Sequence, residues 1–208
     1  MGVNGIDRGN RMSVTILLHF SVHGAFSLED FCIFLWFCSK NFVFLQRETT
    51  KEMEKQIVIN YQEYNSLDEL PEAMGLLVSE AVEAAASAYA PYSGFHVGAA
   101  LRLADGSVVR GSNQENAAYP SGLCAERTAI FAASAQRADC RDYEALAIVG
   151  CNERGELCEA SPCGACRQVM AEFEGRQGHA MRVVCYLDGG RVRVFGSVAD
   201  LLPFSFQF

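Results

Sequence analysis

The chain has 208 residues and a formal net charge of −8, with half of its residues apolar and a fifth charged. This length suits one globular domain with a sizeable core, and the composition excludes a disordered chain. No cluster of Lys and Arg of the kind that binds a phosphate backbone is present, so we expect no nucleic-acid partner. The nine cysteines are an odd number in a chain too long for a small disulfide scaffold. Two of them, Cys163 and Cys166, form a CxxC typical of metal binding or redox chemistry in a reducing compartment, and we predict a cytoplasmic location.

The first 52 residues differ in character from the rest of the chain. Residues 13–45 are rich in Phe, Leu, Ile and Cys, yet they show neither a helical nor an alternating period. Charged and His residues interrupt every apolar run before it reaches the ~18 residues of a spanning helix, so we expect no membrane partner. Three interpretations stay open: a start codon set too early, which we favour, a targeting or anchoring segment, and an ordered extension. We predict a domain over residues 53–208, preceded by an extension of unknown role over residues 1–52.

From Met53 onward the chain alternates between helical and strand patterns. A first helix is predicted where an Ala-rich stretch begins with Pro71 and stops before Pro91. Two strand patterns flank the turn signal Asp105-Gly106, which indicates a hairpin. These elements, with those that follow, favour an α/β domain in which helices cover a mixed sheet. The expected elements in chain order are a helix at Pro71–Ala90, strands at His96–Leu103 and Ser107–Gly111, a helix at Cys124–Ala135, a strand at Ala145–Cys151, a helix at Ala165–Glu174, strands at Met181–Leu187 and Arg191–Phe195, and a short helix at Ser197–Leu202.

Four residues at two predicted helix starts carry the chemistry. Cys124 opens one helix, while Cys163 and Cys166 open another, and a thiolate at a helix N-terminus is stabilised by the dipole and free N–H groups. Three thiolates can hold one Zn²⁺ ion and leave the fourth position open to water, which is the layout of a catalytic rather than a structural zinc site. Glu126, two residues after the first ligand, is placed to carry protons beside that water.

Cys-Ala-Glu at 124–126, followed by Pro-Cys-x-x-Cys at 162–166, resembles the cytidine deaminase family, in its three-cysteine, homotetrameric branch. The resemblance covers the chain from roughly Glu69 to the C-terminus. It implies a three-layer α/β/α fold with a mixed sheet of about five strands. It also implies zinc-dependent deamination of cytidine and/or deoxycytidine to uridine or deoxyuridine in pyrimidine salvage, without ranking the two nucleosides. Further segments in family order are residues 92–100, 113–119, 124–129 and 201–206.

The resemblance also implies how a nucleoside is bound. Asn113 and Glu115 correspond to residues that hydrogen-bond ribose hydroxyls, and Phe95 to one that packs on the pyrimidine. A carboxylate near the sugar repels a 5′-phosphate, which favours free nucleoside over nucleotide or polymer. Further implied contacts to the nucleoside come from the backbone of Ala125 and Ser161 and, across a subunit boundary, from the aromatic residues Tyr119 and Phe206.

The summed charge of the metal and its ligands predicts a cation beside the metal. Three thiolates and Zn²⁺ sum to −1, so a guanidinium donating to sulfur would restore acidity to the bound water. Arg127 lies on the same helix face as Cys124, and the family uses an arginine there in this way. Arg167, directly after Cys166, is a second candidate with less support.

Three rival interpretations remain. The chain could deaminate another small aminopyrimidine nucleoside, although the segment at 113–119 favours a ribosyl substrate. It could be a non-catalytic zinc-binding module, which Glu126 and the absence of an obvious fourth ligand disfavour. A redox CxxC protein is disfavoured because Cys163 follows a proline and is accompanied by Cys124. The other cysteines are expected to be small apolar fillers: Cys32, Cys38, Cys140, Cys151, Cys158 and Cys185.

Overall fold

The computed structural model describes residues 54–136 and 142–207. The chain divides into two units, Met1–Met53 and Glu54–Phe208, and the description concerns the second. The predictions made for residues 1–52 and for Cys140 lie outside the described residues.

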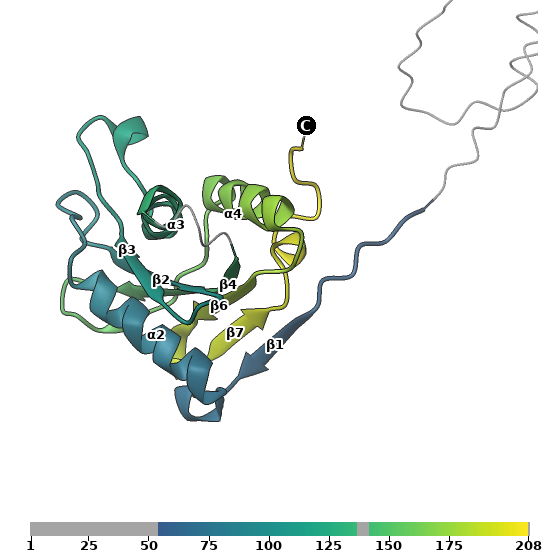
Figure 1. Ribbon diagram of the computed structural model, residues 1–208. Helices are drawn as coiled ribbons and strands as arrows, with labels where there is room; N and C mark the ends of the chain where they lie inside the picture. The colour runs from purple at the N-terminus through teal and green to yellow at the C-terminus, as the bar shows by residue number, and fades with distance from the viewer. Residues whose placement is uncertain (1–53, 137–141, 208) are drawn as a thin grey trace, which may run out of the picture. The chain divides into compact units, whose positions relative to one another are not determined.

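A seven-stranded mixed sheet forms the centre of the domain, with the order β1-β7-β6-β4-β2-β3 and β5 paired with β4 (Figure 1). The pair β4 and β6 is parallel, and the other neighbouring strands are antiparallel. The predicted hairpin around Asp105-Gly106 is the antiparallel pair β2 and β3. The strands are β1 (Tyr61–Tyr64), β2 (His96–Leu103), β3 (Val108–Ser112), β4 (Tyr143–Cys151), β5 (Leu157–Cys158), β6 (Arg182–Tyr186) and β7 (Val192–Phe195).

The expected count of about five strands is therefore wrong, while the mixed sheet and the α/β class are confirmed. The two additional strands are β1 and β5. β1 is a mostly exposed, polar strand whose sequence YQEY lacks a buried alternating face. β5 is only two residues long and is defined by its pairing with β4. Neither strand carries the hydrophobic period by which a strand is found from sequence.

Three helices cover the two faces of the sheet (Figure 1). One core cluster packs α2 (Glu72–Ala85) against one face, and another packs α3 (Ala125–Gln136) and α4 (Gly164–Gln177) against the opposite face. The alternation along β2 shows how one strand serves both cores: Leu101 belongs to the α3 and α4 side, whereas Ala100 belongs to the α2 side. The three-layer architecture is confirmed.

The helix predictions differ from the structure mainly at the ends. The first helix ends at Ala85 rather than Ala90, and α4 runs three residues beyond the predicted end. The predicted short helix near the C-terminus is a single 3-10 turn, Val198–Asp200, capped by the Ser197 hydroxyl. Further 3-10 turns lie at Leu67–Glu69, Tyr119–Ser121 and Asp188–Gly190.

Two glycines let helices lie directly on the sheet. A Cβ at Gly111 of β3 would collide with the backbone N of Ala129 in α3. A Cβ at Gly98 of β2 would collide with the carbonyl oxygen of Ala81 in α2. Because backbone atoms cannot move aside as a flexible side chain can, these positions require glycine for the observed packing. The close approach at Gly111 fixes the distance between the first turns of α3 and the sheet.

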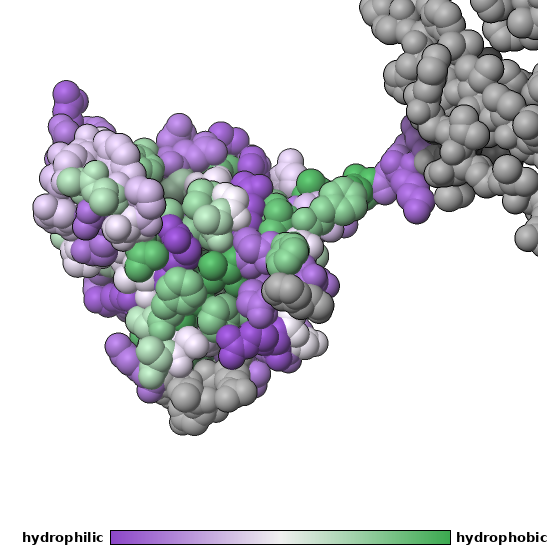
Figure 2. All heavy atoms as spheres, turned by 90° about the horizontal axis from the view of Figure 1, so that it is seen from above, coloured by the Kyte–Doolittle hydropathy of each residue, from purple (hydrophilic) through white to green (hydrophobic). Residues whose placement is uncertain are grey.

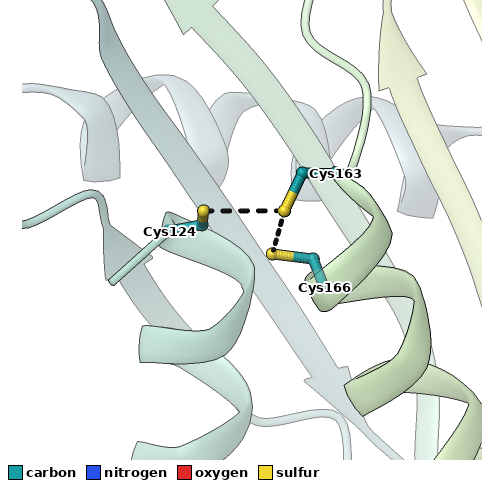
Figure 3. A group of neighbouring side chains, drawn as sticks. All are labelled: Cys124, Cys163 and Cys166. Atoms are coloured by element: carbon teal, nitrogen blue, oxygen red, sulfur yellow. Dashed lines mark hydrogen bonds between the residues drawn. The ribbon is translucent and has the colours of Figure 1, made fainter. Parts of the chain in front are cut away.

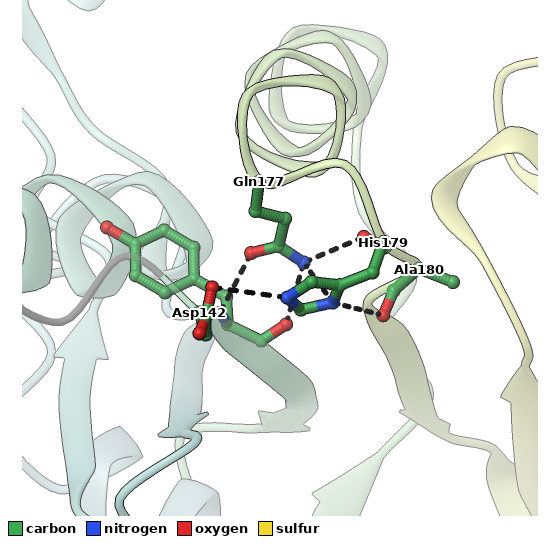
Figure 4. Close-up of polar contacts among 5 residues, drawn as sticks. Asp142, Gln177, His179 and Ala180 are labelled. Atoms are coloured by element: carbon green, nitrogen blue, oxygen red, sulfur yellow. Dashed lines mark hydrogen bonds and ion pairs between the residues drawn. The ribbon is translucent and has the colours of Figure 1, made fainter.

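Polar contacts tie the end of α4 to the start of β4 (Figure 4). The Gln177 amide donates to the carbonyl of Tyr143 at 3.0 Å and accepts from its N–H at 2.8 Å. His179 Nε2 lies 3.2 Å from a carboxylate oxygen of Asp142. α4 is thus held to the central strand at its C-terminal end, which leaves its N-terminal end to be positioned by other contacts. No helix within residues 54–136 and 142–207 has the length and apolar character needed to cross a membrane.

Candidate metal centre and active site

The three predicted cysteine ligands meet where two helices begin (Figure 3). Cys124 immediately precedes α3, Cys163 is the N-cap residue of α4, and Cys166 lies in the first turn of α4. Their sulfur atoms all lie within 4.8 Å of one another, with 3.8 Å between Cys124 and Cys163 and 3.5 Å between Cys163 and Cys166. Residues 39 positions apart in the sequence are therefore brought into direct contact.

This cluster fits a zinc ion. Zinc binds thiolate sulfur at about 2.3 Å, so two sulfurs of a tetrahedral site lie about 3.8 Å apart. The distances from Cys163 to the other two sulfurs, 3.8 Å and 3.5 Å, are close to that spacing, and the third pair lies within 4.8 Å. The donor set is three soft sulfur ligands, which suits Zn²⁺ better than Mg²⁺ or Ca²⁺. Cys163 is exposed while Cys166 is buried, so the cluster has one side toward the surface.

The thiols differ in acidity because they hydrogen-bond to one another. A hydrogen bond with Cys166, followed by contacts with the Arg127 guanidinium and with Cys163, lowers the pKa of Cys124 to about 5. The same hydrogen bond with Cys124, together with burial, raises the pKa of Cys166. Negative charge therefore settles first on Cys124, at the N-terminus of α3, where free N–H groups stabilise a thiolate.

Glu126 is the buried carboxyl of the site. It lies in the first turn of α3, two residues after Cys124, and only 3% of its surface is exposed. Burial raises the pKa of the Glu126 carboxyl to about 6, and the negative charge of Cys124 also raises it, whereas a backbone hydrogen bond lowers it. A carboxyl poised near neutrality can both accept and release a proton, as a general base that later acts as an acid must do.

Arg127 and Arg167 make different kinds of contact. Arg127 Nη2 donates to the sulfur of Cys124 at 3.7 Å, in the manner expected from the sequence. Among the buried side-chain N and O atoms of the described residues, its Nε alone has no hydrogen-bond partner. Arg167 instead donates to two carbonyl oxygens, that of Pro162 at 2.8 Å and that of Leu201 at 3.1 Å. Arg167 therefore holds the loop before Cys163, and neither of these contacts reaches a cysteine sulfur.

The residues expected at the sugar and base lie where the start of β2 meets the end of β3: Phe95 directly precedes β2, and Asn113 directly follows β3. Asn113 accepts from the N–H of Val97 at 2.7 Å and donates to the carbonyl of Phe95 at 2.9 Å. The Phe95 ring lies against Gly150, where a Cβ would approach it to 2.8 Å. Part of the Asn113 amide is thus used to fix the backbone of Phe95, a function that its spacing in the sequence did not indicate.

Glu115 is held by the loop that precedes Phe95. Its Oε2 accepts from the backbone N–H groups of Tyr92 at 2.9 Å and Ser93 at 3.3 Å. Hydrogen bonds from the Ser93 side chain and from the Tyr92 backbone lower the pKa of this carboxyl. Glu115 is therefore a fixed negative charge in a half-buried position.

The two aromatic residues expected at a subunit boundary are largely exposed. Tyr119 is 75% exposed and meets the ring of Tyr92 edge-on, with 6.0 Å between centroids. Phe206 is 65% exposed. Figure 2 looks onto the side of the domain that carries α3, α4 and the C-terminal segment in Figure 1, and apolar surface is exposed there. By contrast Ala125, whose backbone was expected to contact the base, is fully buried at the start of α3, and Ser161 is exposed two residues before Cys163.

The remaining described cysteines lie away from the three-sulfur cluster. Cys151 and Cys185 are buried and Cys158 is half-buried, on β4, β6 and β5. Burial raises the pKa of Cys185 to about 12, as expected of a thiol that fills the core. The sequence reasoning did not single out Gln168, whose side chain hydrogen-bonds to the backbone of Phe206. Its position two residues after Cys166 was the available signal.

Fold and site together define a three-layer α/β protein with a three-cysteine centre that fits zinc and a buried carboxyl beside it. Residues 72–185 match the family of the cytidine and deoxycytidylate deaminase zinc-binding region. The cytidine deaminase of Halalkalibacterium halodurans is 53% identical over 98 residues, which cover 47% of this chain and 70% of that protein. The crystal structure of cytidine deaminase from Burkholderia pseudomallei matches with a TM-score of 0.55 at 45% identity, covering 63% of this chain and 97% of that chain. The one from Mycobacterium tuberculosis matches with a TM-score of 0.51 at 35% identity, covering 65% and 98%. This chain belongs to the cytidine and deoxycytidylate deaminase family.

Proposed function

We propose that this chain hydrolyses the 4-amino group of cytidine and/or deoxycytidine, giving uridine or deoxyuridine and ammonia in pyrimidine salvage. The observation that carries the proposal is the buried Glu126 carboxyl beside the three-cysteine cluster, in a chain that belongs to the deaminase family. A non-catalytic zinc module does not need a carboxyl at this position, whereas deamination needs a proton carrier beside the metal-bound water.

Cys124, Cys163 and Cys166 hold one zinc ion per chain in this proposal. When bound, zinc lowers the pKa of a coordinated water enough to supply a nucleophile at neutral pH. The Arg127 guanidinium, 3.7 Å from the Cys124 sulfur, withdraws negative charge from the thiolates. That withdrawal offsets the extra charge of a three-thiolate ligand set.

Glu126 moves the protons. Its carboxylate accepts a proton from the attacking water and delivers it to N3 of the pyrimidine, which makes C4 electrophilic. After the oxygen has added to C4, Glu126 delivers the second proton to the departing amine, and the C4–N bond breaks to release ammonia. The net change is nucleoside plus water to deaminated nucleoside plus ammonia. One carboxyl serves as base and then as acid, for which its raised pKa is suited.

Asn113, Glu115 and Phe95 bind the nucleoside. The Asn113 amide nitrogen carries two hydrogens, of which the contact with Phe95 uses one, so a second is available to a ribose hydroxyl. The Glu115 carboxylate can accept from a sugar hydroxyl in addition to the backbone N–H groups that hold it. Phe95 is 37% exposed and can pack on the base. The charge of Glu115 disfavours a 5′-phosphate, so the substrate is a free nucleoside. The Ala125 backbone, with that of Ser161, contacts the base.

The working enzyme is a cytoplasmic homotetramer in this proposal. Tyr119 and Phe206, which are exposed in the single chain, close the nucleoside pocket of a neighbouring subunit. What supports this assembly is the free-energy cost of leaving large aromatic side chains in water and the need to exclude water from the reacting centre.

A substrate panel tests the proposed reaction. Purified protein is incubated separately with cytidine, deoxycytidine, cytosine, cytidine 5′-monophosphate and an aminonucleoside antibiotic, and released ammonia is measured. We expect ammonia from one or both free nucleosides, and at least about tenfold less from the phosphorylated one. Glu126→Gln protein, matched in zinc content, serves as the control for contaminating deaminase. Turnover of the antibiotic alone, or of no compound, would overturn the proposal.

A further inference from the structure

The C-terminal segment is attached to the helix that carries two of the zinc ligands. Gln168 lies in α4 two residues after Cys166, and its side chain reaches the backbone of Phe206. Gln168 Nε2 donates to the Phe206 carbonyl at 2.9 Å, and the Phe206 N–H donates to Gln168 Oε1 at 2.9 Å. The carboxamide thus satisfies both backbone polar groups of one residue.

This paired contact fixes the direction of an aromatic side chain. Two hydrogen bonds from one planar amide restrain the peptide groups on both sides of Phe206, and therefore the direction of its Cα–Cβ bond. Phe206 is 65% exposed, so burial contributes little to fixing its position. The paired hydrogen bonds with Gln168 are a direct restraint on its backbone.

A neighbouring residue fixes the other end of the same segment. Arg167 Nη1 donates to the Leu201 carbonyl at 3.1 Å, while its Nε donates to the Pro162 carbonyl at 2.8 Å. Consecutive residues of α4 therefore hold the tail at positions 201 and 206, directly after Cys166. The end of the chain and the metal-binding turn are positioned on one short stretch of helix.

We propose that Gln168 is a positioning residue for nucleoside binding, which acts by holding the backbone of Phe206. This inference rests on the proposed function, in which the Phe206 ring closes a nucleoside pocket. Gln168 is not a catalytic residue, since it touches neither the cysteines nor Glu126 in any described contact. Its removal should weaken nucleoside binding and leave proton transfer and metal content unchanged.

A double-mutant cycle tests the inference. We expect Gln168→Ala to raise KM for the preferred nucleoside about three- to tenfold, with kcat changed less than about twofold and zinc content unchanged. In a Phe206→Ala background, adding Gln168→Ala should change KM no further, because the residue then has no ring to position. Glu172→Ala, an exposed position one turn along the same helix, is the matched control and should behave as wild type. Gln168→Glu keeps the acceptor for the Phe206 N–H but loses the donor, so an intermediate KM is expected.

Hydrogen exchange at the Phe206 amide provides a readout that does not depend on activity. We expect faster exchange at residues 204–207 in Gln168→Ala, with exchange in β4 unchanged. A wild-type KM in Gln168→Ala, or a KM increase of the same size in the Phe206→Ala background, would overturn the positioning role even if the tail exchanges faster. Absence of deamination in the wild-type protein would instead overturn the proposed function, and unchanged exchange in the variant would then also show that Gln168 does not hold the tail.

Discussion

At the scale of single residues, the site depends on a carboxyl that the fold has removed from water. Glu126 is 3% exposed, and burial is the main reason its pKa is raised to about 6. A surface glutamate at the same distance from a metal would be ionised at neutral pH and a poorer proton donor. The environment of the residue, rather than its identity alone, suits it to both halves of the proton transfer that we propose for it.

Replacing that carboxyl by an amide isolates its contribution. Glu126→Gln keeps shape and burial but cannot shuttle protons, so we expect kcat to fall by about two to four orders of magnitude. Zinc content and thermal unfolding should be close to wild type. Steady-state kinetics with cytidine and metal analysis of the same preparation are the measurements. Retention of more than about a tenth of the wild-type activity would contradict the assigned mechanism.

Metal content distinguishes the three ligands from the other cysteines. Alanine at Cys124, Cys163 or Cys166 should lower zinc per chain, because each substitution removes one of the three proposed protein ligands. Cys151→Ala is the control, since Cys151 is buried on β4 and belongs to the core, and it should keep about one zinc per chain. Elemental analysis of the purified variants gives the answer. Full zinc occupancy in Cys163→Ala would contradict the three-cysteine site.

The sequence predicts these residues because their relations are local. Cys124 with Glu126, and Cys163 with Cys166, are each close enough in sequence to share a helix turn, and only the meeting of the two turns requires the fold. The contacts of Asn113 and Arg167 with backbone groups were not predictable in the same way. Most of those partners are 16 to 34 residues distant, while the Pro162 carbonyl is five residues from Arg167. All of them are backbone atoms, which side-chain type does not reveal.

At the scale of elements, β1 is held by charge as well as by strand pairing. Glu63 accepts from Arg191 at 2.8 Å and from Arg193 at 3.0 Å, both at the β7 end of the sheet. Arg193 also lies over the Tyr61 ring, 4.9 Å from its centroid. Because β1 is an exposed edge strand with few buried side chains, these contacts add to the backbone pairing that attaches it to β7.

This attachment should depend on pH. A hydrogen bond from Arg193, with the charges of both arginines, lowers the pKa of Glu63 below its ordinary value. A lowered carboxyl pKa stabilises the folded form above the unfolded pKa, and that stabilisation is lost as pH falls through the folded pKa. We therefore expect β1 amides to lose protection in acid before β4 amides do, measured by hydrogen exchange.

The Glu63→Gln variant supplies the test of that assignment. Its β1 should already be less protected at neutral pH and should show little further change on acidification. Glu54→Gln, in the exposed segment before β1, is the matched control and should follow wild type. Equal protection of β1 in wild type and Glu63→Gln at every pH would show that the ion pairs do not attach the strand.

The elements that the sequence predicts are those with a buried face. The hairpin, β4 and the three helices carry hydrophobic periods that the cores then use. β1 and β5 are not found from the sequence because pairing leaves no local period: β1 pairs with the distant strand β7, and β5 is a two-residue strand that pairs with the nearby end of β4. The length of the short C-terminal helix is likewise overestimated from the sequence, because the apolar residues there pack into the core without continuing a helix.

At the scale of the whole molecule, the domain is expected to be self-sufficient. The three-cysteine centre, Glu126 and the residues proposed to bind nucleoside all lie between positions 95 and 206. We predict that the fragment 53–208 is soluble, binds zinc and has the activity of the full chain. Expression of both forms and a comparison of kcat/KM per zinc is the measurement. An insoluble or inactive fragment would show that residues 1–52 contribute to the fold or the site.

Assembly is the second whole-molecule prediction. Exposed Phe204 and Phe206 at the end of the chain favour burial against a neighbouring copy, and we expect a tetramer by light scattering. Phe206→Ala should weaken nucleoside binding, and removal of residues 204–208 should weaken assembly as well. A fully active monomer at the assay concentration would contradict both the shared pocket and the contribution assigned to Phe206.

The central claim is zinc-dependent deamination of a free nucleoside, and the absorbance of cytidine tests it most directly. Purified protein is mixed with cytidine before chelation, after removal of zinc by a chelator, and after zinc is restored. We predict loss of the cytidine absorbance in the first and third samples, with uridine and ammonia in equal amounts, and none in the second. Undiminished activity in metal-free protein, or no activity in protein that carries one zinc per chain, would contradict the account.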